Sequence, residues 1–88
     1  MKIEKKDLMD YFIGETIRMA RKRKGMSRID LSIALNDYGI DLSEYTIKSY
    51  EMARTACPIS VFFAIAKIFK LDINSIFSEF KKEFFDKE

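Results

Sequence analysis

The chain has 88 residues, of which 48% are hydrophobic and 14% aromatic, so it can form the core of one compact domain and is not expected to be disordered. It contains one cysteine and no histidine, which excludes an intrachain disulfide and a zinc site of the usual Cys/His type. No stretch approaches the roughly 20 apolar residues that cross a bilayer, and we therefore expect a cytoplasmic protein that does not associate with membranes.

The charge of the chain is almost balanced, at +2 overall, but it is unevenly distributed. Residues 16–28 contain six basic side chains and no acidic one, whereas basic and acidic residues cancel after residue 54. A local positive strip fits contact with a polyanion. On charge alone, however, a solvated helix face is the more ordinary interpretation.

Helical periodicity dominates the chain, which has three glycines, one proline and no sustained strand-like alternation. A first helix is predicted over about 10–24, because Ile13, Ile17 and Ala20 recur at three- and four-residue spacing. Gly25 follows directly, at the position where a helix end favours a left-handed residue. The first helix is therefore predicted to end at this glycine.

A second helix is predicted after Ser27, which together with Asp30 three residues later resembles a capping box. Asn36 tolerates a left-handed conformation and is predicted to stop this helix. Residues 37–41 then form a loop. The residues expected to pin this loop to the core are Ile40 and Leu42.

Ser43 is predicted to cap a third helix, with Glu44 favourably placed near its positive end. Pro58 suits the first turn of a fourth helix, which is apolar on most of its faces. Asp72 is predicted to cap a fifth helix, which leads into a charged tail. The fold class predicted from these patterns is all-α, with five short helices.

Four segments carry a family resemblance: Ile13-Gly14-Glu15-Thr16-Ile17-Arg18, Gly25-Met26-Ser27-Arg28-Ile29-Asp30-Leu31-Ser32, Thr46-Ile47-Lys48-Ser49-Tyr50-Glu51 and Leu71-Asp72-Ile73-Asn74-Ser75-Ile76-Phe77. In this order and near-correct spacing, the chain resembles the phage-repressor-type helix-turn-helix family, also called lambda-repressor-like, Cro/repressor-type or XRE. The resemblance covers about residues 13–77. It implies a compact five-helix lambda-repressor-like domain spanning 1–88, with a helix-turn-helix and a C-terminal helical extension over 78–88.

The resemblance also implies a function, namely a sequence-specific DNA-binding transcriptional regulator, most simply a repressor, that uses neither cofactor nor metal. Helix 43–51 would enter the major groove of double-stranded DNA, where its first turn reaches the base edges. Arg28 has the place where the family makes a phosphate contact, and Arg54 is a second phosphate candidate. For each of these side chains the alternative is solvated surface. The expected DNA-binding residues are Arg28, Glu44, Tyr45, Thr46, Lys48, Ser49 and Arg54.

In the family, an arginine late in helix one pairs with the glutamate that ends helix three. Arg21 and Glu51 hold those positions here, so the resemblance implies a structural ion pair between them. The alternative is two independent surface charges, whose pairing would contribute well under about 1 kcal/mol.

The chain departs from the family pattern at several positions. About five extra residues, Asp37–Asp41, lengthen the turn between helices two and three. Ala53 replaces the usual glycine after Glu51, so we expect the end of helix three to be built differently. Glu44 replaces a common glutamine, and its carboxylate can accept a hydrogen bond from cytosine N4.

A domain of this size buries little surface on DNA, so we expect a two-fold homodimer. The dimer interface, or seam, is predicted at the last helix and tail, where Phe80, Phe84 and Phe85 supply apolar area. The alternative is that such rings complete the core, as we expect for Phe77. An enzyme is not expected, because histidine, a cysteine–base pair and a glycine-rich phosphate loop are all missing. The alternative function is a protein-binding adaptor or antitoxin with weak or no DNA affinity.

Overall fold

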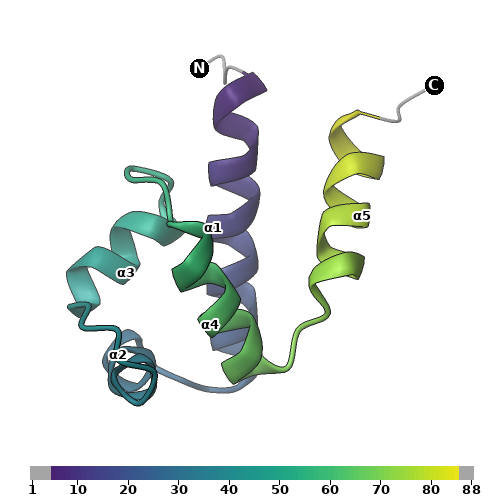
Figure 1. Ribbon diagram of the computed structural model, residues 1–88. Helices are drawn as coiled ribbons and strands as arrows, with labels where there is room; N and C mark the ends of the chain where they lie inside the picture. The colour runs from purple at the N-terminus through teal and green to yellow at the C-terminus, as the bar shows by residue number, and fades with distance from the viewer. Residues whose placement is uncertain (1–4, 86–88) are drawn as a thin grey trace.

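The computed structural model describes residues 5–85, without the side chains of residues 5–7 and 84, and no strand occurs in this part of the chain. Its helices are α1 (Lys5–Arg23), α2 (Arg28–Asn36), α3 (Glu44–Glu51), α4 (Ile59–Phe69) and α5 (Ile73–Phe84) (Figure 1). The prediction of an all-α chain with five helices is confirmed. The start of the first helix was placed too late, because α1 begins at Lys5 rather than near residue 10.

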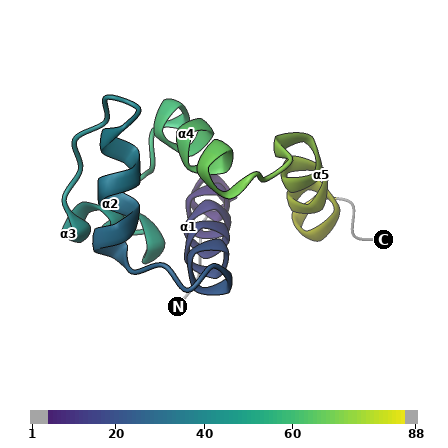
Figure 2. The ribbon, with the colours of Figure 1, turned by 90° about the horizontal axis from the view of Figure 1, so that it is seen from below.

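The long helix α1 stands in the middle of the molecule, with α2 and α3 on one side and α5 on the other (Figures 1 and 2). Helix α4 packs on both α1 and α2. One apolar core joins the helices, and each fully buried aliphatic or aromatic side chain contributes about 1.5–3 kcal/mol relative to an exposed one. The largest fully buried side chains are Ile17, Leu31, Leu35, Ile47, Phe62 and Ile65.

The side-chain caps predicted at Ser27, Ser43 and Asp72 are formed, and they fix where α2, α3 and α5 begin. The Ser27 hydroxyl accepts the N–H of Asp30 at 3.0 Å, and the Asp30 carboxylate accepts the N–H of Ser27 at 3.0 Å, which completes the capping box. The hydrogen bond that the Ser27 N–H donates to the carboxylate is the main cause that holds the pKa of the Asp30 carboxyl below its usual value. The Ser43 hydroxyl accepts the third N–H of α3 at 3.2 Å, and the Asp72 carboxylate accepts the second N–H of α5 at 3.1 Å.

Helix α2 ends at Asn36, as predicted, but the left-handed residue is Gly39 rather than Asn36. Asn36 is still helical, and the chain continues through tight turns to Gly39, which has φ 76°. The N–H of Ile40 then bonds to the carbonyl of Leu35 at 3.1 Å. Gly39 ends the turn because it has no Cβ, so a positive φ costs it little. Asn36 has a Cβ, and a positive φ there would cost free energy.

The end of α3 has a left-handed alanine. Ala53, which stands where the family pattern has a glycine, has φ 58°, a conformation that a residue with a Cβ rarely adopts. The N–H of Ala53 bonds to the carbonyl of Tyr50 at 3.1 Å and that of Arg54 to Ser49 at 2.9 Å, which together form a Schellman motif. The buried side of α3 and these hydrogen bonds hold the alanine in this conformation.

A glycine at position 53 should therefore stabilise the protein. A left-handed conformation costs a residue with a Cβ roughly 1–2 kcal/mol, so we expect Ala53→Gly to raise the free energy of unfolding by about 1 kcal/mol. Urea denaturation followed by far-UV circular dichroism measures this change. Ala34→Gly, inside α2, is the matched control and should lower stability by about 1 kcal/mol. A less stable Ala53→Gly variant would contradict the left-handed assignment.

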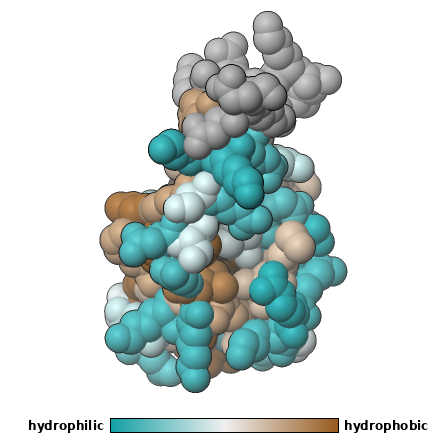
Figure 3. All heavy atoms as spheres, turned by 90° about the vertical axis from the view of Figure 1, so that its right-hand side faces the viewer, coloured by the Kyte–Doolittle hydropathy of each residue, from teal (hydrophilic) through white to brown (hydrophobic). Residues whose placement is uncertain are grey.

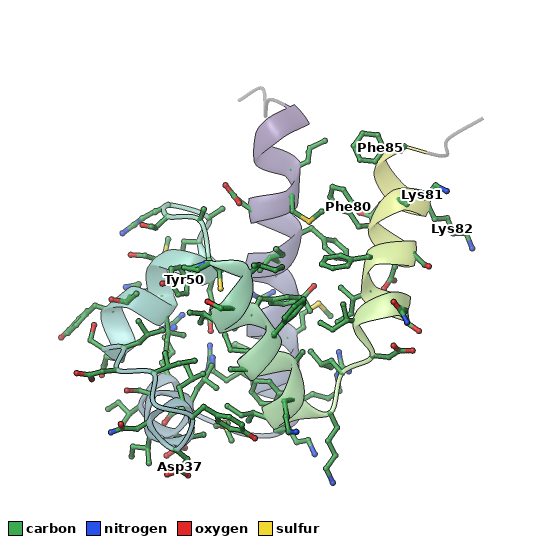
Figure 4. The ribbon with its side chains drawn as sticks, in the orientation of Figure 1. Asp37, Tyr50, Phe80, Lys81, Lys82 and Phe85 are labelled. Atoms are coloured by element: carbon green, nitrogen blue, oxygen red, sulfur yellow. The ribbon has the colours of Figure 1, made fainter. Side chains whose placement is uncertain are left out.

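Helix α5 corrects part of the predicted dimer seam. Phe80 is only 5% exposed, and its ring packs edge-on against Phe12 of α1 at a centroid distance of 5.2 Å (Figure 4). Phe85 is 50% exposed and its ring contacts that of Phe80 at 5.5 Å. Phe80 thus fills space between α1 and α5 within one chain, while the side chain of Phe84 lies outside the described residues. The side of α5 that faces away from α1 is mainly hydrophilic, and apolar side chains are visible next to it on this face of the molecule (Figure 3).

Candidate nucleic-acid interface

Helix α3 is held by its apolar side and exposes its polar side. Ile47 is fully buried and Tyr50 is 6% exposed, and both pack in the core, where α3 contacts α1 and α2. Helix α5 lies on the far side of α1 in both ribbon views (Figures 1 and 2). The polar face of α3 is therefore not covered by α5.

The predicted base-reading residues differ in how far they reach solvent. Tyr45 is 75% exposed and Lys48 is exposed, so these two side chains project from α3. Glu44 and Ser49 are half-buried. Thr46 is half-buried and its hydroxyl lies 3.2 Å from that of Ser43, which ties it to the helix cap. Tyr45 and Lys48 are consequently the most accessible of the predicted set on this helix.

The lengthened turn before α3 is anchored to the protein where it leads into the helix, but not at its tip. The Ser32 hydroxyl on α2 donates a hydrogen bond to the backbone carbonyl of Leu42, and Ile40 and Leu42 both pack against the core, as predicted. At the outer end of the turn, a Cβ on Gly39 would meet no atom within 4 Å. The extra residues thus extend outward near Gly39, while the segment that leads into α3 is anchored.

Glu51 joins three helices through one buried carboxylate. Arg21, at the end of α1, donates from Nε to Oε2 at 2.7 Å and from Nη2 to Oε1 at 3.1 Å. Its Nη1 donates to the carbonyl of Met26 at 3.0 Å, which also fixes the turn after α1. The structure therefore contains the paired arrangement of Arg21 and Glu51 that the family resemblance implied.

Arg28 makes a contact that the sequence reasoning missed. Its Nε donates to Oε1 of Glu51 at 3.1 Å, so the carboxylate serves two arginines. No local signal in the sequence indicates this contact, because the two residues lie on different helices and are 23 positions apart. Arg54, the second predicted phosphate contact, is exposed in the loop after α3.

Other kinds of site find no support in the described residues. No group of three or more potential metal-ligating side chains occurs within residues 5–85, and no helix there is long and apolar enough to span a bilayer. Burial raises the pKa of the Cys57 thiol to about 12, so this cysteine is a poor nucleophile at neutral pH.

Comparisons of the chain with protein-family models, curated proteins and solved structures find no match. The candidate interface consists of the exposed side of α3 and the beginning of α2, together with the end of α1, where Lys22, Arg23 and Lys24 are exposed.

Proposed function

We propose that the protein is a sequence-specific DNA-binding transcriptional regulator, most simply a repressor, with a lambda-repressor-like helix-turn-helix formed by α2 and α3. The observation that carries this proposal is the exposure of the polar side of α3, with Tyr45 and Lys48 projecting from a helix whose apolar side is buried. The major groove of B-DNA admits one such helix. Tyr45 would contact a thymine methyl group or a phosphate, and Glu44 would accept a hydrogen bond from cytosine N4.

Charge supports the same orientation on DNA. The exposed basic side chains at the end of α1 and the half-buried Arg28 at the start of α2 lie on segments that adjoin in the chain. The first N–H groups of α2 and the helix dipole also favour an anion at this end. These groups would bind phosphates and set the register of α3, and the side chains of α3 would read the bases.

A homodimer belongs to this proposal, because paired half-sites about 34 Å apart supply the affinity that one small domain lacks. The seam cannot depend on the Phe80 ring, which α1 already covers. Of the rings predicted to form it, Phe85 is half-exposed at the end of α5. Selection of bound sequences from a random duplex pool tests both parts, since a regulator of this kind should yield a palindromic consensus.

Lys48→Ala gives a sharper test of the docking geometry. Removing one positive charge that faces the DNA should weaken binding to every duplex and reduce the slope of log affinity against log salt by about one unit. Fluorescence anisotropy with labelled duplex over a range of salt measures both quantities. Lys67→Ala is the matched control, because Lys67 is exposed on α4, away from α3, and should leave the slope unchanged. An unaltered slope in Lys48→Ala would contradict insertion of α3.

A second candidate function is protein binding, for which α2 provides one observation. Ile29 and Ile33 lie one turn apart on this helix and are 54% and 62% exposed, with the acidic Asp30 between them. An apolar, acidic face suits a protein partner better than a phosphate backbone. Retention on heparin and on random duplex discriminates the two, because a DNA-binding protein elutes at a strongly salt-dependent position and an adaptor without DNA affinity is not retained.

A further inference from the structure

The Glu51 carboxylate is completely buried, and the two arginines that it binds are exposed to different extents. The side chain of Arg21 is 9% exposed and that of Arg28 is 33% exposed. Both are held by charge-assisted hydrogen bonds of 2.7–3.1 Å, which are stronger than neutral ones. One anion therefore fixes one interior and one surface guanidinium.

The two guanidinium groups also use their nitrogens differently. Arg21 donates from all three nitrogens to protein oxygens. Arg28 donates only from Nε, and within residues 5–85 its terminal nitrogens Nη1 and Nη2 have no hydrogen-bond partner. A guanidinium offers its donors in a rigid fork, so holding Nε fixes the direction of the terminal pair. Arg28 is thus a surface donor whose orientation is already set.

We propose that Glu51 is a positioning residue for a phosphate of the DNA backbone, acting through Arg28. The buried carboxylate holds Nε of Arg28 so that Nη1 and Nη2 meet a phosphate beside the first turn of α2. This inference rests on the proposed DNA binding and adds a role for an acidic residue that itself touches no DNA. Because Glu51 ends α3 and Arg28 begins α2, the same contact fixes the phosphate donor relative to the helix that reads the bases.

The direction in which removing the Glu51 charge changes the affinity for DNA tests this inference. Removing a negative charge from a DNA-binding protein ordinarily strengthens its attraction to DNA, since phosphate contacts dominate affinity. Glu51→Gln should instead weaken binding to random duplex about tenfold, the usual order for one charge-assisted hydrogen bond. Glu15→Gln removes the same charge from a carboxylate that pairs with Arg18 on α1, and should bind as tightly as the wild type or more tightly.

A second pair of variants tests the fork geometry at constant charge. Arg28→Lys keeps the charge but loses the Nε donor and the fixed fork, and should weaken binding about tenfold. Lys67→Arg exchanges the same two residue types at constant charge, at an exposed position on α4 outside the candidate interface, and should keep wild-type affinity. Anisotropy with random duplex at a fixed salt concentration measures all four variants, after circular dichroism has shown that each is folded. If Glu51→Gln does not fold, the comparison of Arg28→Lys with its constant-charge control tests the inference.

A double variant separates positioning from general damage to α3. In an Arg28→Ala background, Glu51→Gln should change affinity less than about twofold, because its effect passes through Arg28. A full tenfold loss in that background would overturn the inference, as would wild-type affinity in either folded Glu51→Gln or Arg28→Lys. Wild-type protein that shows no salt-dependent binding would instead overturn the proposed function and this inference together.

Discussion

Gly14→Ala should destabilise the protein by about 3 kcal/mol, although alanine is the better helix former. An added Cβ would lie 2.3 Å from the carbonyl oxygen of Tyr50 and 2.9 Å from that of Glu51, both of them backbone atoms. Backbone cannot rotate away, so α1 and α3 would have to separate, and overpacking of this kind costs about 1–3 kcal/mol or more. The gain in helix propensity, about 1 kcal/mol, offsets only part of that cost.

Chemical denaturation followed by circular dichroism measures this loss. Gly39→Ala is the control, because a Cβ there meets no neighbouring atom and the substitution should cost only about 1–2 kcal/mol for its positive φ. A Gly14→Ala variant more stable than the wild type would mean that propensity outweighs the contact, and that α1 and α3 do not approach so closely. A shifted α3 should also weaken the proposed DNA binding in any variant that still folds.

Glu51→Ala should cost about 3–5 kcal/mol, because it leaves the Arg21 guanidinium buried without its counter-ion. The loss should come mainly from Arg21, whose side chain is 9% exposed, since the more exposed Arg28 can regain water. Arg28→Ala should accordingly cost less than about 1 kcal/mol, in the range of surface pairs. Urea midpoints of the two variants test this ranking.

An apolar replacement of the buried pair separates the cost of an unpaired charge from the cost of lost packing. Arg21→Met combined with Glu51→Leu should recover most of the stability lost in Glu51→Ala, since no buried charge remains unpaired. Equal stability of Glu51→Ala and the wild type would show that the pair is solvated in solution. A double variant as unstable as the single one would place the cost in packing rather than charge.

The features that local chemistry determines were predicted well. A side-chain cap depends on residues two or three positions apart, so the caps Ser27, Ser43 and Asp72 could be located from the sequence. The left-handed residues were harder to predict. Gly39 and Asn36 are both candidates for the positive φ in the turn after α2, and no local pattern shows that packing holds Ala53 in a positive φ.

Features that depend on tertiary contact were not accessible. The spacing of Phe77, Phe80 and Phe84 places them on one side of a helix, but it cannot show whether α1 or a second chain covers that side. For the same reason the close contact of α1 with α3 at Gly14 could not be predicted, because the atoms next to Gly14 belong to the backbone of Tyr50 and Glu51 on a distant part of the chain. In the candidate interface, the family resemblance supplied the pairing of Arg21 with Glu51, whereas the contact of Arg28 with Glu51 appears only in three dimensions.

The central place of α1 has a consequence for how the molecule opens. This helix packs against α3, α4 and α5, so it cannot fray in its middle without releasing the rest of the core. Amide hydrogens around Ile17 should therefore exchange with solvent only when the whole chain unfolds, while those of α5, which packs mainly on α1, should exchange through smaller fluctuations. The protein would then behave as one cooperative unit to which its last helix is more loosely attached.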